Sequence, residues 1–205
     1  MHVAIAGNIG SGKTTLAERL AKHYGWKPEF EDVDFNPYLS DFYADMIRWS
    51  FHIQIYFLNS RFRQIMNVKN SKTSIIQDRT IYEDAEVFAK NLNEAGLLND
   101  RDYNTYLDLY HNLMPHIKHP DLLIYLKADI PVLVGRIERR GRAYENLIRL
   151  DYLRDLNRLY ENWINAYDHS KLLVIDANKI NFDSNVEDLA QVINMVESEI
   201  HGLFS

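Results

Sequence analysis

The chain has 205 residues, 46% of them hydrophobic and 25% charged, so enough apolar side chains are present to build a core and a disordered protein is excluded. The net charge of −6 argues against non-specific binding to nucleic acid or to anionic membranes. Because the sequence has no cysteine, disulfides, thiol nucleophiles and cysteine-ligated metal centres are excluded as well.

Short apolar segments alternate along the chain with longer segments of helical periodicity. The predicted strands are His2–Ala6, Pro28–Glu31, Thr73–Gln77, Leu122–Leu126 and Leu172–Ile175. The predicted helices are Lys13–Tyr24, Pro37–Trp49, Phe51–Val68, Asp84–Leu92, Asp102–Ile117, Pro131–Arg139, Tyr152–Tyr167 and Val186–Ile200. Because parallel strands need long crossover connections, the alternation predicts an α/β fold with a five-stranded parallel sheet and helices on both of its faces.

Two further expectations concern the chain as a whole. No apolar run is long enough to span a bilayer, and the segment Met1–Ala6 lacks the positive start and the cleavage site of a signal peptide. No internal repeat or Pro/Gly-rich linker divides the sequence. We therefore expect a cytoplasmic protein that forms a single domain over residues 1–205, with no membrane or nucleic-acid partner.

A complete phosphate-binding loop, G-x-x-x-x-G-K-[ST], lies between the first predicted strand and the first predicted helix. Backbone N–H groups of such a loop and of the helix N-terminus bind phosphate oxygens. A lysine at this position supplies a cation to the β- and γ-phosphates, and a following hydroxyl can ligate Mg²⁺. The residues predicted to bind a nucleoside triphosphate, with ATP as the donor, are Gly7, Asn8, Ile9, Gly10, Ser11, Gly12, Lys13, Thr14 and Thr15. The alternative is a glycine-rich turn that matches the pattern by chance.

The third predicted strand is followed by Asp78 and Arg79. The carboxyl edge of a parallel sheet is where such folds place their ligands. Asp78 is therefore a candidate Mg²⁺ ligand beside Thr14, and Arg79 a candidate ligand of a phosphate or a hydroxyl group. The alternative is an ordinary ion pair at the end of a strand.

Four arginines surround Gly141 at the end of the helix Pro131–Arg139. They are Arg136, Arg139, Arg140 and Arg142. In a protein that binds a triphosphate, this cluster suggests a lid whose guanidinium groups bind phosphate oxygens and exclude water. The alternative is a solvated group of charges that interacts with the helix dipole.

Several of these segments together resemble the deoxynucleoside kinase family, whose members phosphorylate deoxynucleosides on the 5′-hydroxyl. The matching segments are Gly7–Thr14, Glu31–Val33, Tyr43, Arg48–Gln54, Ser60–Arg61, Asp78–Asp84 and Arg140–Glu145. The runs Asp-Arg-Thr and Trp-Ser-Phe-x-x-Gln are the most discriminating. The resemblance extends from Gly7 to about Tyr160, and it implies a three-layer P-loop kinase with ATP and Mg²⁺, an arginine-bearing lid at about 139–146, and a homodimer.

By this resemblance, Glu31 is the base that receives the proton of the 5′-hydroxyl, and Arg79 contacts the same hydroxyl. Asp32 and Asp34 lie close by in the sequence but do not match the family position. Phosphoryl transfer mainly requires alignment and charge neutralisation, so a carboxylate that holds the hydroxyl is sufficient. Catalysis is thus expected from Glu31, Arg79, Lys13, Arg140 and Arg142.

The resemblance also assigns the sugar and base contacts. Tyr43 and Glu145 would hold the 3′-hydroxyl, although Tyr43 could equally be a core residue of its helix. The base-pocket residues would be Gln54, Arg61, Asp84 and Phe88. A carboxylate at Asp84 favours a base with an exocyclic amine and disfavours the carbonyl edge of thymine.

The sequence also bears on which base the pocket accepts and on two alternative functions. Ile53 stands where an aromatic residue often packs on the base, and this less aromatic pocket and the short lid favour a purine, with deoxyadenosine first and deoxyguanosine or deoxycytidine as alternatives. A thymidylate-type nucleotide kinase is disfavoured because Glu31 would repel an acceptor phosphate. A non-catalytic nucleotide-binding subunit is disfavoured because Lys13, Glu31 and Arg79 are all present.

Overall fold

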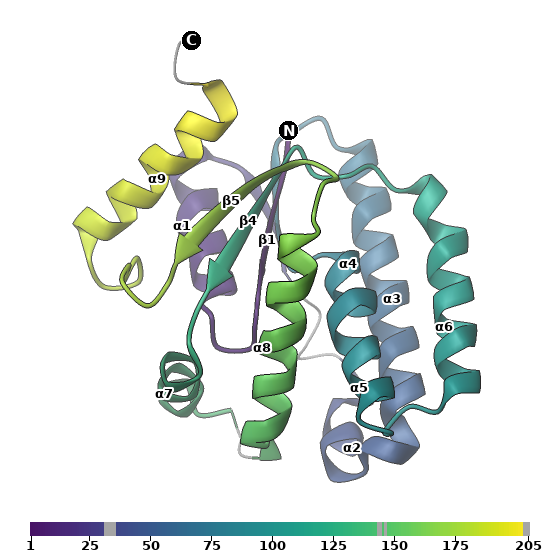
Figure 1. Cartoon of the computed structure of the whole chain (residues 1–205). Coiled ribbons are helices and arrows are strands. Elements are labelled where there is room, and N and C mark those ends of the chain that lie inside the picture. Colours follow the sequence, from purple (N-terminus) through teal and green to yellow (C-terminus); the bar gives the residue numbers. More distant parts are fainter. Residues whose placement is uncertain (31–35, 143–144, 146, 203–205) are drawn as a thin grey trace.

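A five-stranded, all-parallel sheet forms the centre of the computed structural model, which describes residues 1–30, 36–142, 145 and 147–202 (Figure 1). Its strands are β1 (His2–Gly7), β2 (Lys27–Glu29), β3 (Ile75–Asp78), β4 (Leu122–Lys127) and β5 (Lys171–Asp176). Their order in the sheet is β2-β3-β1-β4-β5, with β1 paired to β3 and β4. The predicted five-stranded parallel sheet is confirmed.

Helices connect the strands. They are α1 (Lys13–Tyr24), α2 (Leu39–Ala44), α3 (Met46–Asn70), α4 (Ile81–Glu83), the π-helix η1 (Asp84–Ala89), α5 (Lys90–Glu94), α6 (Asp100–Leu113), the 3₁₀-helix η2 (Met114–His116), α7 (Ile130–Arg140), α8 (Leu150–Asn165) and α9 (Val186–His201). Among the described residues, no helix has both the length and the apolar content needed to cross a membrane.

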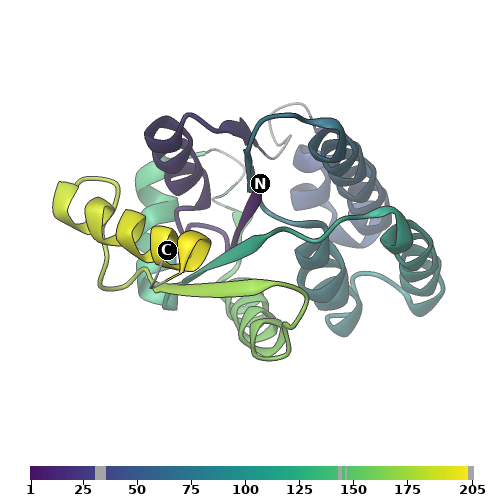
Figure 2. The ribbon, with the colours of Figure 1, turned by 90° about the horizontal axis from the view of Figure 1, so that it is seen from above.

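Helices cover both faces of the sheet (Figures 1 and 2), and a separate hydrophobic core lies on each face. On one face, β1 and β4 pack against α1, α7 and α9 through residues such as Leu16, Leu133 and Val192. On the other face they pack against α3, η1, α6 and α8 through residues such as Leu58 and Tyr160. The inner strands are buried over most of their length, as expected for a sheet covered on both sides. The three-layer architecture is therefore confirmed.

The predicted helices Pro37–Trp49 and Phe51–Val68 have different bounds in the structure. The helical conformation is interrupted at Asp45, where φ is −146° and ψ is 84°, and one continuous helix then runs from Met46 to Asn70. The Asp45 side chain accepts a hydrogen bond from the backbone N–H of Arg48, so it caps the new helix. The sequence prediction missed this cap because apolar residues continue at helical spacing across it.

Two other predicted elements also differ. The helix predicted over Asp84–Leu92 begins at Ile81 and includes the π-helical turn of η1. The helix predicted over Asp102–Ile117 starts at Asp100, where Asn99 caps it, and becomes 3₁₀-helical after Leu113. The second strand is three residues long, and position 31, the end of the predicted strand, lies outside the described residues.

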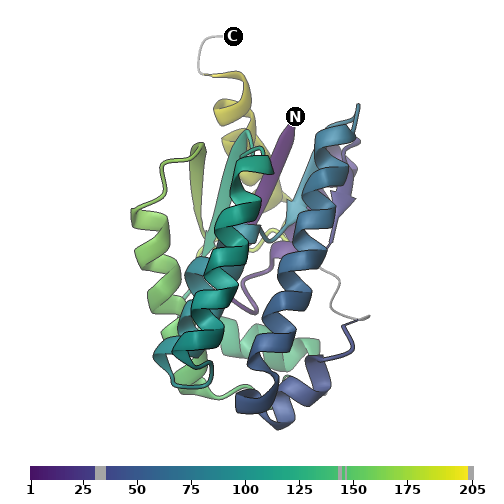
Figure 3. The same ribbon diagram turned by 90° about the vertical axis from the view of Figure 1, so that its right-hand side faces the viewer.

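All five strands point the same way, so their carboxyl ends form one edge of the sheet. β1 ends there in the phosphate loop and β3 ends there at Asp78. Seen from the side, α3 and α6 lie next to each other on the outside of the molecule (Figure 3). Segments far apart in the sequence thus meet at the edge where parallel α/β sheets bind ligands.

Candidate active site

The phosphate loop adopts a backbone that requires glycine. Gly10 and Gly12 have φ values of 84° and 100°, in the left-handed region that other residues rarely adopt. A Cβ atom on Gly10 would also lie 2.8 Å from the carbonyl oxygen of Leu133. Helix α1 begins at Lys13 directly after the loop, so the N-terminal end of its dipole faces the loop, as phosphate binding requires.

Side chains from distant elements hold the loop in place. The Asn8 side chain donates to the carbonyl oxygen of Leu153 and to Oδ1 of Asn157, at 3.1 Å each, and accepts from the N–H of Ile9. The Lys13 ammonium donates to the carbonyl oxygen of Asn8 at 3.0 Å. Contacts to α8 therefore fix the loop before any phosphate binds.

Arg136 supplies a further anchor. Its guanidinium donates to the carbonyl oxygens of Ser11 and Ala177, both at 2.8 Å. Arg136 therefore joins the phosphate loop to the segment after β5, and it also lines a hollow of about 290 Å³ beside the loop. The other residues lining that hollow are Gly10, Gly12, Thr15, Arg139, Arg140, Asn181, Phe182 and Asp183.

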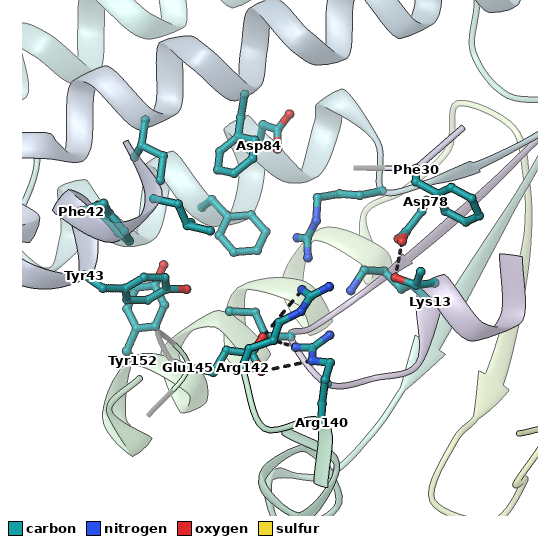
Figure 4. A pocket seen from close by; sticks show the side chains of 18 of the residues that line it. Lys13, Phe30, Phe42, Tyr43, Asp78, Asp84, Arg140, Arg142, Glu145 and Tyr152 are labelled. Atoms are coloured by element: carbon teal, nitrogen blue, oxygen red, sulfur yellow. Dashed lines mark hydrogen bonds and ion pairs between the residues drawn. The ribbon is translucent and has the colours of Figure 1, made fainter. Parts of the chain in front are cut away.

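Asp78 and Thr14 lie together, as the sequence predicted. The Thr14 hydroxyl donates to Oδ2 of Asp78 at 2.5 Å, and the contact is drawn in Figure 4. Oδ1 of Asp78 is buried and has no hydrogen-bond partner among the described residues. A buried carboxylate oxygen without a partner is costly, so this atom is suited to a cation.

Arg79 has a buried and strained position. Its φ of 71° makes it the one non-glycine residue with a positive φ in the part of the chain that the structure describes. The guanidinium lies 4.4 Å from the centre of the Phe88 ring and donates to the Tyr160 hydroxyl at 2.9 Å. Non-glycine residues in this conformation cost free energy and concentrate at functional sites.

The predicted base-pocket residues are buried in the helical layer. Nε of Arg61 donates to Oδ2 of Asp84 at 3.4 Å, and Arg61 also donates to the carbonyl oxygen of Asp78 at 3.1 Å. Oε1 of Gln54 is buried and has no partner among the described residues. The side chains of Gln54 and Asp84 line the same cavity, whereas Arg61, the partner of Asp84, does not line it.

Arg140, the last residue of α7, and Arg142, just after the helix, both face Glu145. Arg140 forms a two-point ion pair with the Glu145 carboxylate, and Nη1 of Arg142 lies 4.0 Å from it (Figure 4). Glu145 is 5% exposed, while each arginine side chain is 36% exposed. The chain reverses at Gly141, which caps α7 with a φ of 67°. Positions 143, 144 and 146 of the predicted lid lie outside the described residues.

One cavity of about 390 Å³ brings most of these side chains together (Figure 4). The predicted site residues that line it are Ile9, Gly10, Lys13, Thr14, Tyr43, Gln54, Asp78, Arg79, Asp84, Phe88, Arg140, Arg142 and Glu145. Arg136 and Thr15 line the neighbouring hollow instead. Glu31, the predicted base, lies outside the described residues, but the cavity wall includes Phe30, the residue before it.

Sequence reasoning missed other residues of the cavity wall. They are Glu18, Phe30, Leu39, Phe42, Phe57 and Tyr152. Phe57 could have been found, because it lies three residues after Gln54 and therefore on the same face of α3. Burial raises the pKa of the Tyr152 phenol, so this hydroxyl stays protonated at neutral pH. Phe42, Phe57 and Tyr152 add aromatic surface to a cavity wall in which Ile53 is aliphatic, as its sequence position indicated.

Comparison with known proteins identifies the family. The model of the deoxynucleoside kinase family matches residues 3–201. The chain belongs to the deoxynucleoside kinase family. It is accordingly a phosphotransferase of deoxynucleoside salvage that uses a nucleotide as phosphoryl donor, as the resemblance implied.

Several relatives align over nearly the whole chain. The deoxyadenosine kinase of Dictyostelium discoideum is 43% identical, with 98% of this chain and 80% of the relative covered. The deoxyadenosine/deoxycytidine kinase of Bacillus subtilis is 39% identical, with 97% and 93% covered. Relatives of slightly lower identity are deoxyguanosine kinases. Among solved structures, a deoxyadenosine kinase from M. mycoides with dCMP and dCDP bound is 34% identical and has a TM-score of 0.86, with 97% of this chain and 100% of that chain covered.

Proposed function

We propose that this deoxynucleoside kinase transfers the γ-phosphoryl group of ATP to the 5′-hydroxyl of a purine deoxynucleoside, with deoxyadenosine preferred. One observation carries the proposal: a single cavity has the phosphate loop with Lys13 at one end and the buried polar groups of Gln54 and Asp84 at the other. A nucleoside that places its base against Asp84 therefore directs its 5′ end toward the phosphate loop.

The donor side uses the phosphate loop and the arginines. Backbone N–H groups of residues 7–15 and the Lys13 ammonium bind the phosphates, and Arg140 and Arg142 bind the transferred group. Arg140 is the last residue of α7 and Arg142 follows Gly141, so a change of backbone at Gly141 would move Arg142 relative to Arg140 and the helix. The hollow lined by Thr15 and Arg136 adjoins the loop, and we assign it to the remainder of the donor nucleotide.

The Thr14 and Asp78 pair fits a magnesium ion. Mg²⁺ takes oxygen ligands and is commonly held by one or two protein groups together with phosphate oxygens. Oδ1 of Asp78 is a buried oxygen that lacks a partner among the described residues, and Thr14 lies at the start of α1 beside it. When bound, the ion would neutralise charge on the phosphates.

On the acceptor side, the family resemblance assigns the 5′-hydroxyl to Glu31 and Arg79. Arg79 lines the cavity together with Asp78 and Asp84, in agreement with such a role. Tyr43 and Glu145 are proposed to bind the 3′-hydroxyl. Glu145 already accepts from Arg140, but a carboxylate has about four lone-pair sites, so it can accept from a sugar hydroxyl as well.

The base is selected by polar groups at the far end of the cavity. The Asp84 carboxylate accepts hydrogen bonds only, so it favours the exocyclic amine of adenine or cytosine and repels O4 of thymine. Phe88 offers an aromatic face for stacking. The preference for deoxyadenosine is supported by the relative from Dictyostelium discoideum, which is a deoxyadenosine kinase, while the relative from Bacillus subtilis is a deoxyadenosine/deoxycytidine kinase.

An assay of the four deoxynucleosides with ATP and Mg²⁺ tests the proposal, with the four deoxynucleoside monophosphates as controls. We expect phosphorylation of deoxyadenosine with the highest kcat/KM, weaker use of deoxyguanosine and deoxycytidine, and rejection of thymidine. A highest value for thymidine would contradict the role of Asp84, and a highest value for deoxycytidine would contradict only the order of bases. Exclusive use of monophosphates would instead favour a nucleotide kinase.

A further inference from the structure

A buried carboxylate beside the cavity has no part in the function described so far. Glu83, at the end of α4, is 0% exposed and does not line the cavity. It accepts hydrogen bonds from the Gly7 N–H at 3.3 Å, from the Thr80 N–H at 2.7 Å, from the Thr80 hydroxyl at 3.1 Å and from the Tyr160 hydroxyl at 2.7 Å. Burial of a carboxylate is unfavourable unless hydrogen bonds compensate for the loss of water, and the four donors around Glu83 provide that compensation.

Tyr160 connects this carboxylate to Arg79. Its hydroxyl donates to Oε1 of Glu83 at 2.7 Å and accepts from Nη1 of Arg79 at 2.9 Å. Oε1 of Glu83 also lies 3.7 Å from Nη1 of Arg79. Tyr160 is fully buried on α8, and this burial raises the pKa of its phenol well above the ordinary value. The hydroxyl therefore keeps its proton at neutral pH and serves as donor and acceptor at once.

We propose that Tyr160 and Glu83 are positioning residues that fix the Arg79 guanidinium at the acceptor hydroxyl and couple it to the start of the phosphate loop through the N–H of Gly7. This inference rests on the role proposed above for Arg79. Neither residue touches the substrate. Both act through Arg79, whose guanidinium lies over the Phe88 ring and donates a hydrogen bond to the Tyr160 hydroxyl.

The chemistry explains why such a pair is needed. An arginine side chain has several rotatable bonds, and holding it in one orientation costs conformational entropy. In phosphoryl transfer, alignment of the hydroxyl and placement of positive charge account for most of the rate, so a small displacement of the guanidinium lowers kcat. The backbone of Arg79 is in an unfavourable region, so contacts at the far end of its side chain are required to keep the residue in place.

The Gly7 bond extends the same network to the donor side. Gly7 is the last residue of β1 and the first of the phosphate loop. Its N–H and the Arg79 guanidinium share one oxygen, Oε1 of Glu83. A single carboxylate oxygen therefore contacts both Arg79 on the acceptor side and the start of the phosphate loop on the donor side, and it fixes their relative position.

The test compares two substitutions that each remove one buried hydroxyl. Tyr160→Phe removes the hydroxyl that contacts Arg79. Tyr125→Phe is the matched control, because the Tyr125 ring lies 6.1 Å from that of Tyr160 and its hydroxyl donates to Glu161 instead. We expect Tyr160→Phe to lower kcat by about 10- to 100-fold with KM for ATP and for the deoxynucleoside changed by less than about threefold, and Tyr125→Phe to leave kcat within about twofold of wild type.

Combining Tyr160→Phe with Arg79→Lys distinguishes an effect on the position of Arg79 from a general loss of stability. Because Tyr160 acts through Arg79, adding Tyr160→Phe to Arg79→Lys should lower kcat by less than about twofold further, whereas independent effects would multiply. Glu83→Gln is a second variant that keeps an oxygen for the Thr80 N–H and removes the charge, and it should also lower kcat selectively. It decides the matter if circular dichroism shows that Tyr160→Phe does not fold.

The outcomes are distinguishable. Folded Tyr160→Phe or Glu83→Gln with the kcat of wild type would overturn the positioning role and leave the proposed function intact. Equal losses in Tyr160→Phe and Tyr125→Phe would also overturn it, because the effect would then be one of packing. Full activity of Arg79→Lys would instead remove the proposed role of Arg79 itself.

Discussion

The backbone conformation of Arg79 is determined by its neighbours in the structure rather than by the intrinsic conformational preference of an arginine. Its left-handed backbone is unfavourable for a side chain with a Cβ atom. Asp78 before it points to Thr14, and Thr80 after it caps α4 through Glu83. The chain must therefore turn sharply at Arg79, and the turn directs the guanidinium into the cavity rather than along the sheet.

The first prediction concerns the proposed base. Glu31→Gln keeps the size of the side chain but removes its ability to take a proton from the 5′-hydroxyl. We expect kcat to fall by about 100-fold or more, with ATP binding retained because the phosphates are bound at the loop. Steady-state kinetics and calorimetric titration with ATP measure the two effects. Asp32→Asn and Asp34→Asn are the controls, and a larger loss in either of them would transfer the role to that residue.

The second prediction concerns the choice of base. Asp84→Asn replaces an acceptor-only group by an amide that can also donate to O4 of thymine. Since charge-assisted hydrogen bonds contribute about 1.5–3 kcal/mol, the ratio of kcat/KM for deoxyadenosine over thymidine should fall by about 10-fold or more. Competition kinetics with both nucleosides measure this ratio. Asp108→Asn, an exposed residue on α6, should leave it unchanged, and an unaltered ratio in Asp84→Asn would refute the proposed contact.

The sequence predicted those parts of the site whose residues are close together along the chain. The phosphate loop lies between a strand and a helix as expected, because its spacing and its glycines specify a local backbone. The aromatic wall was not foreseen, since Phe42 and Tyr152 reach the cavity only through the packing of α2 and α8. The hydroxyl of Tyr160 lies 77 positions from Glu83, and no pattern along the chain indicates such a pair.

At the scale of the element, the break before α3 determines where the base-pocket side chains point. The five strands were recognisable from short apolar runs, but the order β2-β3-β1-β4-β5 is a property of the assembled sheet. The cap at Asp45 sets the start of α3, so Gln54 and Arg61, two turns apart, lie on its buried side. The π-helical turn of η1 carries Asp84 and Phe88, and π-turns are rare insertions often found at functional sites.

The third prediction tests the cap of α3. Asp45→Ala removes the carboxylate that accepts from the N–H of Arg48 at 3.1 Å. We expect the free energy of unfolding to fall by about 1 kcal/mol, the usual contribution of a helix N-cap. Urea denaturation followed by circular dichroism measures the change. Asp45→Asn retains an oxygen for capping and should restore most of the loss. Equal destabilisation by both substitutions would show that the cap does not contribute.

At the scale of the whole molecule, the two faces of the sheet are covered differently. The layer of α1, α7 and α9 covers one core, whereas α3 and α6 form an outer layer beyond the other, side by side at the surface (Figure 3). Leu109 on α6 is 40% exposed, and Ile47 at the start of α3 is 72% exposed. Apolar side chains on adjacent outward helices are typical of a surface that associates with another protein.

The fourth prediction is a homodimer that associates through α3 and α6, as the family resemblance implied. Apolar side chains on these helices would then be buried against those of a second copy, with a two-fold axis relating the same patch on both chains. Multi-angle light scattering at micromolar concentration should give twice the chain mass of 24.1 kDa. Leu109→Glu places a charge in the proposed interface, where it would be buried without a partner, and should shift the mass to that of a monomer.

Val186→Glu is the matched control for that substitution. Val186 is 81% exposed and begins α9, in the helical layer on the opposite face of the sheet. It adds the same charge to the surface without touching α3 or α6, so the dimer mass should persist. A monomer mass for the wild-type chain would exclude the dimer. Loss of the dimer in Val186→Glu but not in Leu109→Glu would place the interface elsewhere on the molecule. Since the cavity lies within one chain, the Leu109→Glu monomer should keep its base preference even where its stability is lower.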